Sequence, residues 1–169
     1  WDNAYFDGSY FHNGKPVPVK GFCTDVFFDY AKRFIKKVKD DDKPFFLEYW
    51  PLYPLTGPRT TTDEYTTPNG GIYVEKMKLV DKWIGELMAE MDTLGIADNT
   101  LVVIMGDNGH FTKYSPQSGY TPMIFRGGKG YTTEGGVRVD AFVRWPGMVE
   151  ADSVAGDIFH VSDLYTTLG

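Results

Sequence analysis

The chain has 169 residues, 42% of them hydrophobic and 16% aromatic, which is enough to bury one core. Its net charge of −6, with no lysine or arginine stripe, argues against nucleic acid as a partner. No apolar run approaches the roughly 18 residues that span a bilayer, and the single cysteine excludes an internal disulfide framework.

Both ends of the sequence are predicted to lie inside a larger unit. The first residues, WDNAYFDGSY, have neither the basic start nor the apolar segment of a secretory signal. The last, HVSDLYTTLG, begin a helical pattern that stops after about two turns. We therefore expect one α/β domain fragment over residues 1–169, which begins with a loop-rich lead-in over residues 1–21.

The first regular element predicted is a helix. Residues 1–21 are rich in Gly, Asn, Asp and Pro, which favours loop. Thr24 and Asp25 then offer an N-cap, and apolar residues recur at three-to-four spacing as far as Val38. Lysines in the last turn suit the helix dipole, and the run DDDK ends the helix.

A strand, a long loop and a second helix follow. Pro44–Trp50 is short, aromatic and bounded by prolines, which predicts a buried strand. Pro51–Gly71 has no period and is predicted to be a long loop, a kind of segment that is often functional. One apolar face from Val74 to Leu94 predicts a helix, with Gly95 as its C-cap.

Two further strands complete the predicted sheet, at Thr100–Met105 and from about Val139 to Arg144. The order strand, helix, strand is typical of a parallel βαβ unit, so the predicted fold class is α/β, with a mostly parallel sheet flanked by helices. Ligands of such sheets bind beyond the carboxyl ends of the strands. We therefore expect Pro51–Pro58 and Gly106–His110 to face a common crevice.

Asp107 and Asn108 follow the predicted strand LVVIM directly. A carboxylate beside a carboxamide offers hard oxygen ligands, which suit Ca²⁺ or Mg²⁺. The pair Asn108–Gly109 is also a strong hairpin-turn signal. Spacing alone leaves the metal site and the turn equally open.

The segment from Arg126 to Gly147, RGGKGYTTEGGVRVDAFVRWPG, is the second candidate for chemistry. Glycines around Lys129 allow the backbone to approach a ligand closely, and the lysine ammonium suits an oxyanion. No G-x-x-x-x-G-K-[ST] motif is present, which disfavours a nucleotide P-loop. A flexible surface loop with solvated charges is the alternative.

These segments together resemble the sulfatase family of the alkaline phosphatase superfamily. The resemblance is carried by ADNTLVVIMGDNG, GGKGYTTEGGVRVDAFVRWPG and DIFHVSDLYTTLG, and upstream by GFCTDVFFDYAKRFI and KPFFLEYWPLYPLTGP. It covers most of the chain from Gly21 onward and implies an alkaline phosphatase-like fold. It also favours the metal site over the turn at Asp107 and Asn108.

The resemblance implies a role for each matching position. Asp107 and Asn108 match the pair that binds the catalytic Ca²⁺, which is Mg²⁺ in some crystals, and Lys129 matches the lysine that contacts the sulfate. The resemblance implies a structural role in shaping the site for Glu134, Gly135, Gly136 and Arg138. The family nucleophile is a formylglycine made from Cys or Ser in a C/S-x-P/A-x-R motif, and its hydrate attacks sulfur while the metal and basic residues stabilise the charge.

The sequence departs from this pattern in two ways. It contains no C/S-x-P/A-x-R motif, and Cys23 stands in CTDVF, where we interpret it as a core residue. The nucleophile and the first metal-binding aspartates are therefore expected outside this chain. Leu52 stands where the family usually has a histidine that reaches the substrate, and leucine can neither donate to an oxyanion nor transfer a proton; Tyr53 is a candidate substitute.

His110 follows the metal pair and has two interpretations. It is a candidate proton donor to the leaving group, and the alternative is a solvated or supporting histidine. His12 is expected in loop, and His160 is expected to pack against or cap a helix. Core packing against the sheet is expected for the N-terminal aromatic residues Tyr5, Phe6, Tyr10 and Phe11, with contact to the substrate as the alternative.

The predicted function is that of a sulfuric ester hydrolase, acting on a small-molecule or saccharide sulfate ester. A phosphoryl or phosphonate hydrolase of the same superfamily and a non-catalytic pseudo-sulfatase are the alternatives. The chain alone is expected to be inactive and to associate with the missing part of its domain. The family resemblance favours a periplasmic or secreted protein.

Overall fold

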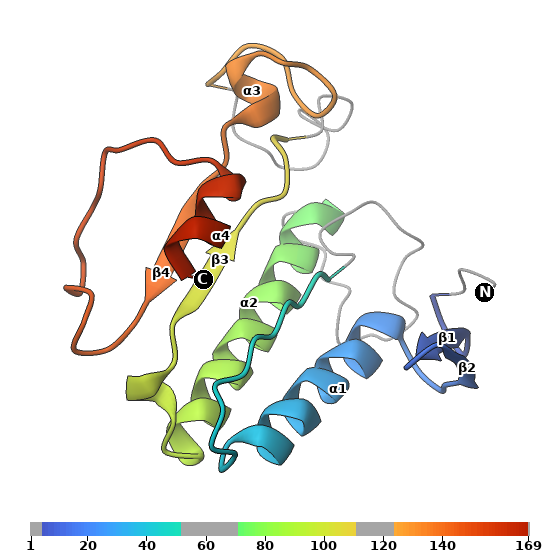
Figure 1. The fold of residues 1–169 in the computed structure, drawn as a ribbon. Helices are drawn as coiled ribbons and strands as arrows, with labels where there is room; N and C mark the ends of the chain where they lie inside the picture. Colours follow the sequence, from blue (N-terminus) through green and yellow to red (C-terminus); the bar gives the residue numbers. More distant parts are fainter. Residues whose placement is uncertain (1–4, 52–70, 111–123, 169) are drawn as a thin grey trace.

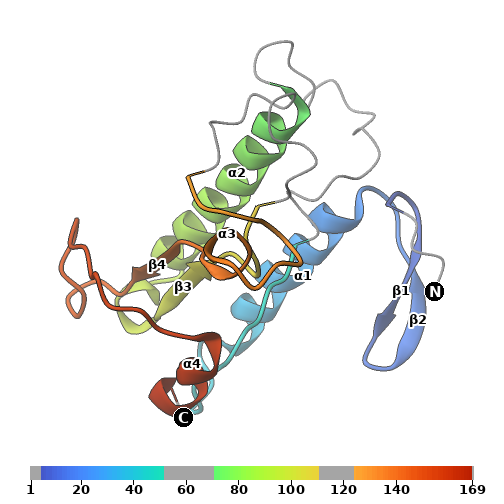
Figure 2. The ribbon, with the colours of Figure 1, turned by 90° about the horizontal axis from the view of Figure 1, so that it is seen from above.

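Two long helices lie side by side at the centre of this computed structural model (Figure 1). A β-hairpin lies beside the first helix, and a second pair of strands and the C-terminal helix lie toward the other side of the helix pair (Figure 2). The structure describes residues 5–51, 71–110 and 124–168.

Helix α1 (Cys23–Val38) forms where the apolar stripe was predicted. It buries Phe28, Ala31 and Ile35, which recur at three-to-four spacing and so share one face. The helix begins slightly earlier than predicted, because Phe22 and not Thr24 is the residue at its N-cap. The predicted lysines lie in its last turn.

Helix α2 (Gly71–Thr93) confirms the second predicted helix and its C-cap. Gly95 has a φ of +69°, and its N–H donates to Asp92 O while the N–H of Ile96 donates to Met91 O, both at 3.1 Å. These are the two bonds of a Schellman motif, which needs a left-handed residue after the helix. A 3-10 turn, η2 (Ala97–Asn99), then leads into the next strand.

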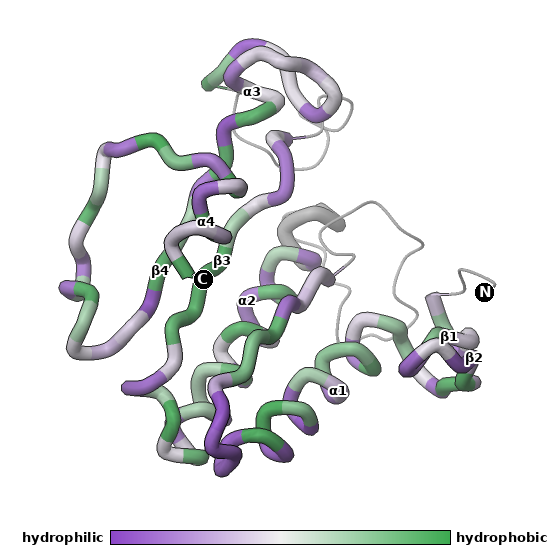
Figure 3. The backbone as a smooth tube through the Cα atoms, in the orientation of Figure 1, coloured by the Kyte–Doolittle hydropathy of each residue, from purple (hydrophilic) through white to green (hydrophobic). Residues whose placement is uncertain are grey.

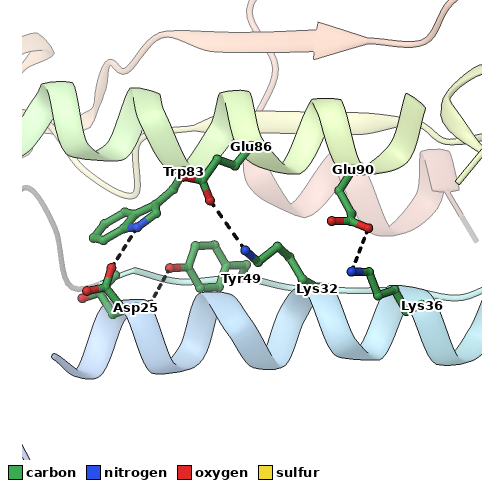
Figure 4. Close-up of polar contacts among 8 residues, drawn as sticks. Asp25, Lys32, Lys36, Tyr49, Trp83, Glu86 and Glu90 are labelled. Carbon is green, nitrogen blue, oxygen red and sulfur yellow. Dashed lines mark hydrogen bonds and ion pairs between the residues drawn. The ribbon is translucent and has the colours of Figure 1, made fainter. Parts of the chain in front are cut away.

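The side chains between α1 and α2 show that the helices run in the same direction. Asp25 contacts Trp83 at 3.0 Å, Lys32 contacts Glu86 at 3.6 Å and Lys36 contacts Glu90 at 3.0 Å (Figure 4). The residue numbers rise together on both helices, which is possible only for a parallel pair.

Pro44–Trp50, predicted to be a strand, is extended but takes no part in a ladder among the described residues. It runs back along α1: Phe45 contacts Phe34, and Tyr49 contacts Phe28 nearer the start of the helix. Burial alternates along it, with the odd-numbered residues 45, 47 and 49 more buried than their neighbours. The alternation of buried and exposed side chains is therefore that of a strand. The prediction of a strand is nevertheless wrong, because no described backbone pairs with this segment.

The prediction of loop over residues 1–21 is also wrong in part. Strands β1 (Ser9–His12) and β2 (Lys15–Pro18) form an antiparallel hairpin. Its turn is Asn13–Gly14, with φ values of 51° and 77°. Two positive φ values are what a type I′ hairpin turn requires, and Asn-Gly supplies them with little strain.

Strands β3 (Val102–Met105) and β4 (Ala141–Arg144) confirm the two later predicted strands with shorter bounds. They pair antiparallel, with Val102 opposite Arg144. The mostly parallel sheet is therefore not formed by the described residues: β3 pairs with the later strand that returns to it, and Pro44–Trp50 does not join the ladder.

The core lies between α1, α2 and the residues before α1. Its buried members are Phe22, Cys23, Phe28, Leu79 and Trp83. Cys23 is 1% exposed, which confirms it as a core residue. The short helix α4 (Val161–Leu168) ends the described chain and has no buried residue. Among the described residues, no helix combines the length and apolar character that crossing a bilayer requires.

Candidate active site

Strand β3 delivers Asp107 and Asn108 to the point where β3 and β4 separate. The N–H of Gly106, the residue after β3, donates to the O of Asp140, the residue before β4, at 3.4 Å. Asp107 beyond it is exposed and Asn108 is half-buried. The side-chain Nδ2 of Asn108 donates to Gly109 O at 2.8 Å, so the amide oxygen Oδ1 is the end left to accept or to ligate.

The hairpin-turn interpretation of Asn108–Gly109 is excluded by the backbone. Neither residue has a positive φ, whereas Asn13–Gly14 has two. A type I′ turn requires positive φ at both central residues. The same dipeptide therefore makes a hairpin in β1–β2 and an open loop after β3.

Lys129 occupies a tight turn of its own. The N–H of Tyr131 donates to Gly128 O at 2.9 Å, which closes the turn over Lys129 and Gly130. Gly130 has a φ of +92°, the conformation that a type II turn requires at its third residue. Lys129 is exposed at the tip, where its ammonium is open to a ligand.

A backbone hydrogen bond joins this turn to the loop after β3. The N–H of Lys129 donates to His110 O at 2.7 Å. The structure thus brings Lys129 next to the segment Asp107–His110, although 18 residues separate Lys129 from His110 in the numbering of the chain. His110 itself is half-buried.

Glycines hold the two segments backbone against backbone. The N–H of Gly109 donates to Gly136 O at 2.9 Å, and a Cβ on Gly109 would overlap the carbonyl oxygen of Gly135. A Cβ on Gly136 would overlap the carbonyl oxygen of Tyr131. These positions require glycine because neighbouring backbone occupies the space of a side chain.

The short helix α3 (Glu134–Val137) completes the support of the Lys129 turn. Thr133 precedes it, and its hydroxyl and the N–H of Gly135 each lie 2.8 Å from Arg126 O, to which both donate. Arg138 pairs with Glu134 at 3.3 Å and lies over the ring of Phe125 at 4.6 Å. These contacts support the structural role expected for this segment.

The donor set suits a hard divalent cation. Asp107 offers a carboxylate and Asn108 an amide oxygen, the ligand types that Ca²⁺ and Mg²⁺ take. Within the described parts of the chain, no group of three or more His, Cys, Asp or Glu side chains is placed to hold a metal. This part of the chain therefore offers two adjacent oxygen donors, fewer than the roughly six to eight oxygens that surround Ca²⁺.

The other predicted residues have separate positions. Leu52 and Tyr53 lie outside the described residues. His12 lies in β1, not in loop, with its ring 5.0 Å from that of Tyr30. His160 caps α4 as expected. Its ring Nδ1 accepts from the backbone N–H of Ser162 at 3.3 Å, and its backbone N–H donates to Asp163 Oδ2 at 2.7 Å.

Among the N-terminal aromatics, Tyr5, Phe6 and Tyr10 pack against the core as expected, whereas Phe11 is 60% exposed. The expectation of core packing is therefore wrong for Phe11. In β1 successive side chains alternate between two faces, and only one of them meets α1.

Sequence reasoning did not identify Gly109 and Thr133 as structural parts of the site. The available signal was the pair of double glycines, 127–128 and 135–136, on either side of the lysine turn. Only the glycines that flank Lys129 were interpreted as room for a ligand. Gly130 does have open space at the position of a Cβ, whereas at Gly135 and Gly136 the protein's own backbone fills that space.

Comparison with known proteins gives one consistent result. The family model described as Sulfatase matches residues 2–169. N-acetylgalactosamine-6-sulfatase of Canis lupus familiaris is 32% identical over 145 residues, which are 85% of this chain and 28% of that protein.

Two solved structures have similar folds. The structure of Ps i-CgsB in complex with k-i-k-neocarrahexaose has a TM-score of 0.68 and 31% identity, over 81% of this chain and 31% of that one. The PsFucS1 sulfatase from Pseudoalteromonas sp. has a TM-score of 0.64 and 32% identity, over 85% and 28% respectively. The chain thus spans less than a third of the length of each of these relatives.

Proposed function

This chain belongs to the sulfatase family, and we propose that the full-length protein hydrolyses sulfate esters with Asp107, Asn108 and Lys129 in its active site. The observation that carries the proposal is the 2.7 Å bond from the N–H of Lys129 to His110 O. It holds the backbone of Lys129 against the loop that carries Asp107 and Asn108 at the end of β3. That combination provides for a cation and for an anion in one place.

The chemistry assigned to these residues follows from their types. Asp107 and Asn108 would hold Ca²⁺, or Mg²⁺, through hard oxygen atoms. The ammonium of Lys129 would bind the sulfate oxygens and offset the charge that develops on them. A divalent cation in this place acts as a Lewis acid on those same oxygens.

The nucleophile has to come from elsewhere in the full-length protein. These 169 residues contain no C/S-x-P/A-x-R motif, and Cys23 is enclosed in the core. A formylglycine formed in such a motif is the nucleophile that the proposal requires. Absence of the motif from the full-length reading frame would remove the mechanism, and we expect no turnover from the 169 residues alone.

His110 is assigned the transfer of a proton to the leaving alcohol. Its place beside the metal pair and its backbone contact to Lys129 support the assignment. If His110 is the acid, His110→Gln lowers kcat far more for an alkyl sulfate, whose leaving alcohol needs a proton, than for an aryl sulfate with a good leaving group. A histidine that only supports the loop would lower kcat equally for both esters.

The substrate class we propose is a saccharide sulfate ester. The support is two similar proteins, an N-acetylgalactosamine-6-sulfatase and a protein solved in complex with k-i-k-neocarrahexaose. Faster turnover of a sulfated oligosaccharide than of an aryl sulfate is the expected result. A preference for the aryl sulfate would place the substrate among small molecules.

The decisive assay uses the purified full-length protein with an aryl sulfate, an aryl phosphate and a sulfated oligosaccharide. Lys129→Ala is expected to reduce kcat/KM about 100-fold to 1,000-fold, as loss of an oxyanion contact does. Asp107→Ala and chelation should both abolish turnover, and Ca²⁺ should restore it only after chelation. Lys37→Ala, an exposed lysine on α1, is the matched control.

Each outcome of this assay favours one of the three interpretations over the other two. Preference for the phosphate ester would favour a phosphoryl hydrolase. No turnover of any ester, in a protein that carries the nucleophile motif, would favour a non-catalytic sulfatase-like protein.

We further infer that the rest of the sulfatase domain packs against the strand pair β3–β4. Phe142 and Val143 point to opposite faces of β4, yet they are 65% and 48% exposed. Apolar residues also continue through the C-terminal segment to α4 (Figure 3). In the full-length protein, amide exchange in β4 should be as slow as in α2; rapid exchange would contradict this packing.

The location we propose is the periplasm or the exterior of the cell, on family resemblance alone. Cell fractionation with a compartment marker tests it directly. Recovery of the full-length protein with the cytosolic marker would overturn it.

A further inference from the structure

We propose that Gly109 and Gly136 are positioning residues that couple cation binding at Asp107 and Asn108 to sulfate binding at Lys129. This inference rests on the proposed function, because it concerns the same two ligands. It goes beyond that function by assigning a communication between their sites.

The first observation is that the two segments are joined at two adjacent points. The N–H of Gly109 donates to Gly136 O at 2.9 Å, and the carbonyl oxygen of the next residue, His110, accepts from Lys129 N–H at 2.7 Å. Two consecutive residues of one loop thus bind both the lysine turn and the helix beneath it. Two bonds fix both the position and the orientation of the loop relative to the lysine turn, whereas a single bond would allow rotation about it.

The second observation is that Gly136 supports the lysine turn directly. A Cβ on Gly136 would lie 2.6 Å from Gly128 O and would overlap Tyr131 O. These oxygens belong to the first and last residues of the turn around Lys129. Gly136 therefore contacts the loop of Gly109 on one side and the turn of Lys129 on the other, and links them by backbone alone.

The third observation is that neither joint can accept a side chain without movement. A Cβ on Gly109 would overlap Gly135 O and would lie 2.7 Å from Gly135 C. Both atoms are backbone, so the added methyl group cannot be relieved by rotating a side chain. The loop must shift, and Asn108 and His110, the neighbours of Gly109 in the chain, shift with it.

This rigidity adds a second coupling to the direct attraction between the cation and the sulfate oxygens. Binding of a cation by Asp107 and Asn108 restricts the loop after β3 and, through the two joints, the turn of Lys129. A sulfate then binds a lysine that is already positioned and loses less conformational entropy. The effect is reciprocal, so bound sulfate raises cation affinity by the same factor.

Calorimetric titration of the full-length protein measures this factor. Sulfate affinity is determined without Ca²⁺ and at saturating Ca²⁺, and Ca²⁺ affinity without and with saturating inorganic sulfate. In the wild type, each ligand is expected to tighten the other about tenfold, within the usual range for coupled sites. In Gly109→Ala only the direct attraction between the cation and the sulfate remains, so the factor should fall about threefold, even at Ca²⁺ concentrations that saturate the weakened site.

A matched glycine serves as the control. Gly156 has no heavy atom within 4 Å of the position of a Cβ and no positive φ. Gly156→Ala is therefore expected to keep the wild-type coupling factor. Loss of coupling in this variant as well would overturn the assignment to Gly109.

A second pair of variants tests the inference in case the Gly109→Ala protein does not fold. The Thr133 hydroxyl donates to Arg126 O at 2.8 Å and holds the start of the lysine segment. Thr133→Val removes this bond and should lower the coupling factor about threefold, and Thr133→Ser should restore it. Equal factors in Thr133→Val and Thr133→Ser would overturn the inference.

Failure of this inference and failure of the proposed function give different results. A wild-type protein that binds neither Ca²⁺ nor sulfate overturns both. A wild type that binds both and couples them, together with a folded Gly109→Ala variant of unchanged coupling factor, overturns the positioning role alone. Retained secondary structure by circular dichroism shows that each variant is folded.

Discussion

The indole N–H of Trp83 donates to the Oδ1 of Asp25 at 3.0 Å and so joins the middle of α2 to the first turn of α1 (Figure 4). Trp83 is almost fully buried and Asp25 is half-buried. The Asp25 carboxylate also lies at the N-terminal end of a helix, where the dipole favours a negative charge. The bond therefore fixes the register of the two parallel helices with a charged acceptor.

Trp83→Phe keeps an aromatic ring and removes this donor. We expect the free energy of unfolding to fall by about 1.5–3 kcal/mol, as for a hydrogen bond to a charged group. Urea denaturation measures the change. Trp145→Phe is the control, because the Trp145 N–H donates to Asp98 O at 3.2 Å in an exposed position; equal losses in the two variants would contradict the prediction.

The ion pair of Lys36 with Glu90 is expected to contribute little. Its Nζ and Oε1 lie 3.0 Å apart, but the lysine is 52% exposed. A double-mutant cycle with Lys36→Met and Glu90→Gln should give a coupling free energy of about 0.2–1 kcal/mol. This value should shrink as salt rises to molar concentration; a coupling of several kcal/mol, or one insensitive to salt, would contradict the prediction.

Gly85 and Gly95 should respond to alanine in opposite directions. Gly85 lies inside α2 with no heavy atom within 4 Å of a Cβ, so Gly85→Ala should stabilise the protein by about 0.5–1 kcal/mol. Gly95 has a φ of +69°, which an L side chain rarely adopts, so Gly95→Ala should destabilise it by about 1 kcal/mol. Thermal unfolding of the two variants side by side tests this, and a shift of the same sign in both would be inconsistent with the Schellman geometry.

Tyr49 should make stability depend on alkaline pH. Burial raises the pKa of the Tyr49 phenol above its usual value, and the nearby Asp25 and Cys23 raise it further. The phenol also donates to Thr24 O at 3.3 Å, a bond that only the neutral form makes. Above about pH 10, an unfolded tyrosine loses its proton while the folded one keeps it.

The unfolded state then binds fewer protons than the folded state, so stability falls as pH rises. The contribution of Tyr49 is fully present below about pH 10 and is lost as pH rises toward its folded pKa. Urea unfolding between pH 8 and 11, compared with Tyr49→Phe, measures it on the approach to the transition. A wild type and a variant with the same pH slope would contradict the prediction.

The local elements of the chain follow from the sequence where the pattern is periodic or the turn chemistry is specific. The apolar stripe of α1, the left-handed glycine after α2 and the core position of Cys23 were all predicted. These features depend on residues close in the chain, so a short stretch of sequence is enough to predict them. The hairpin at Asn13–Gly14 had the same kind of local signal and was overlooked among glycines and prolines.

Pairing and proximity could not be derived from such windows. The dipeptide Asn-Gly makes a type I′ turn at Asn13 and an open loop at Asn108, and only the partner strand distinguishes them. Pro44–Trp50 has the alternation of a strand but pairs with no described backbone. Strand partnership is a property of two segments, so the pattern of one cannot specify it.

The sequence by itself determined which residues the proposed function uses: a carboxylate, an amide and a lysine, singled out through segments similar to sulfatases. Only the tertiary structure decided that Lys129 lies against His110, and that Gly109 and Gly136 make the contact. Residue types and local patterns report what a side chain can do. The approach of two distant backbones depends on the absence of side chains at both contact points, which becomes apparent only when the chain has folded.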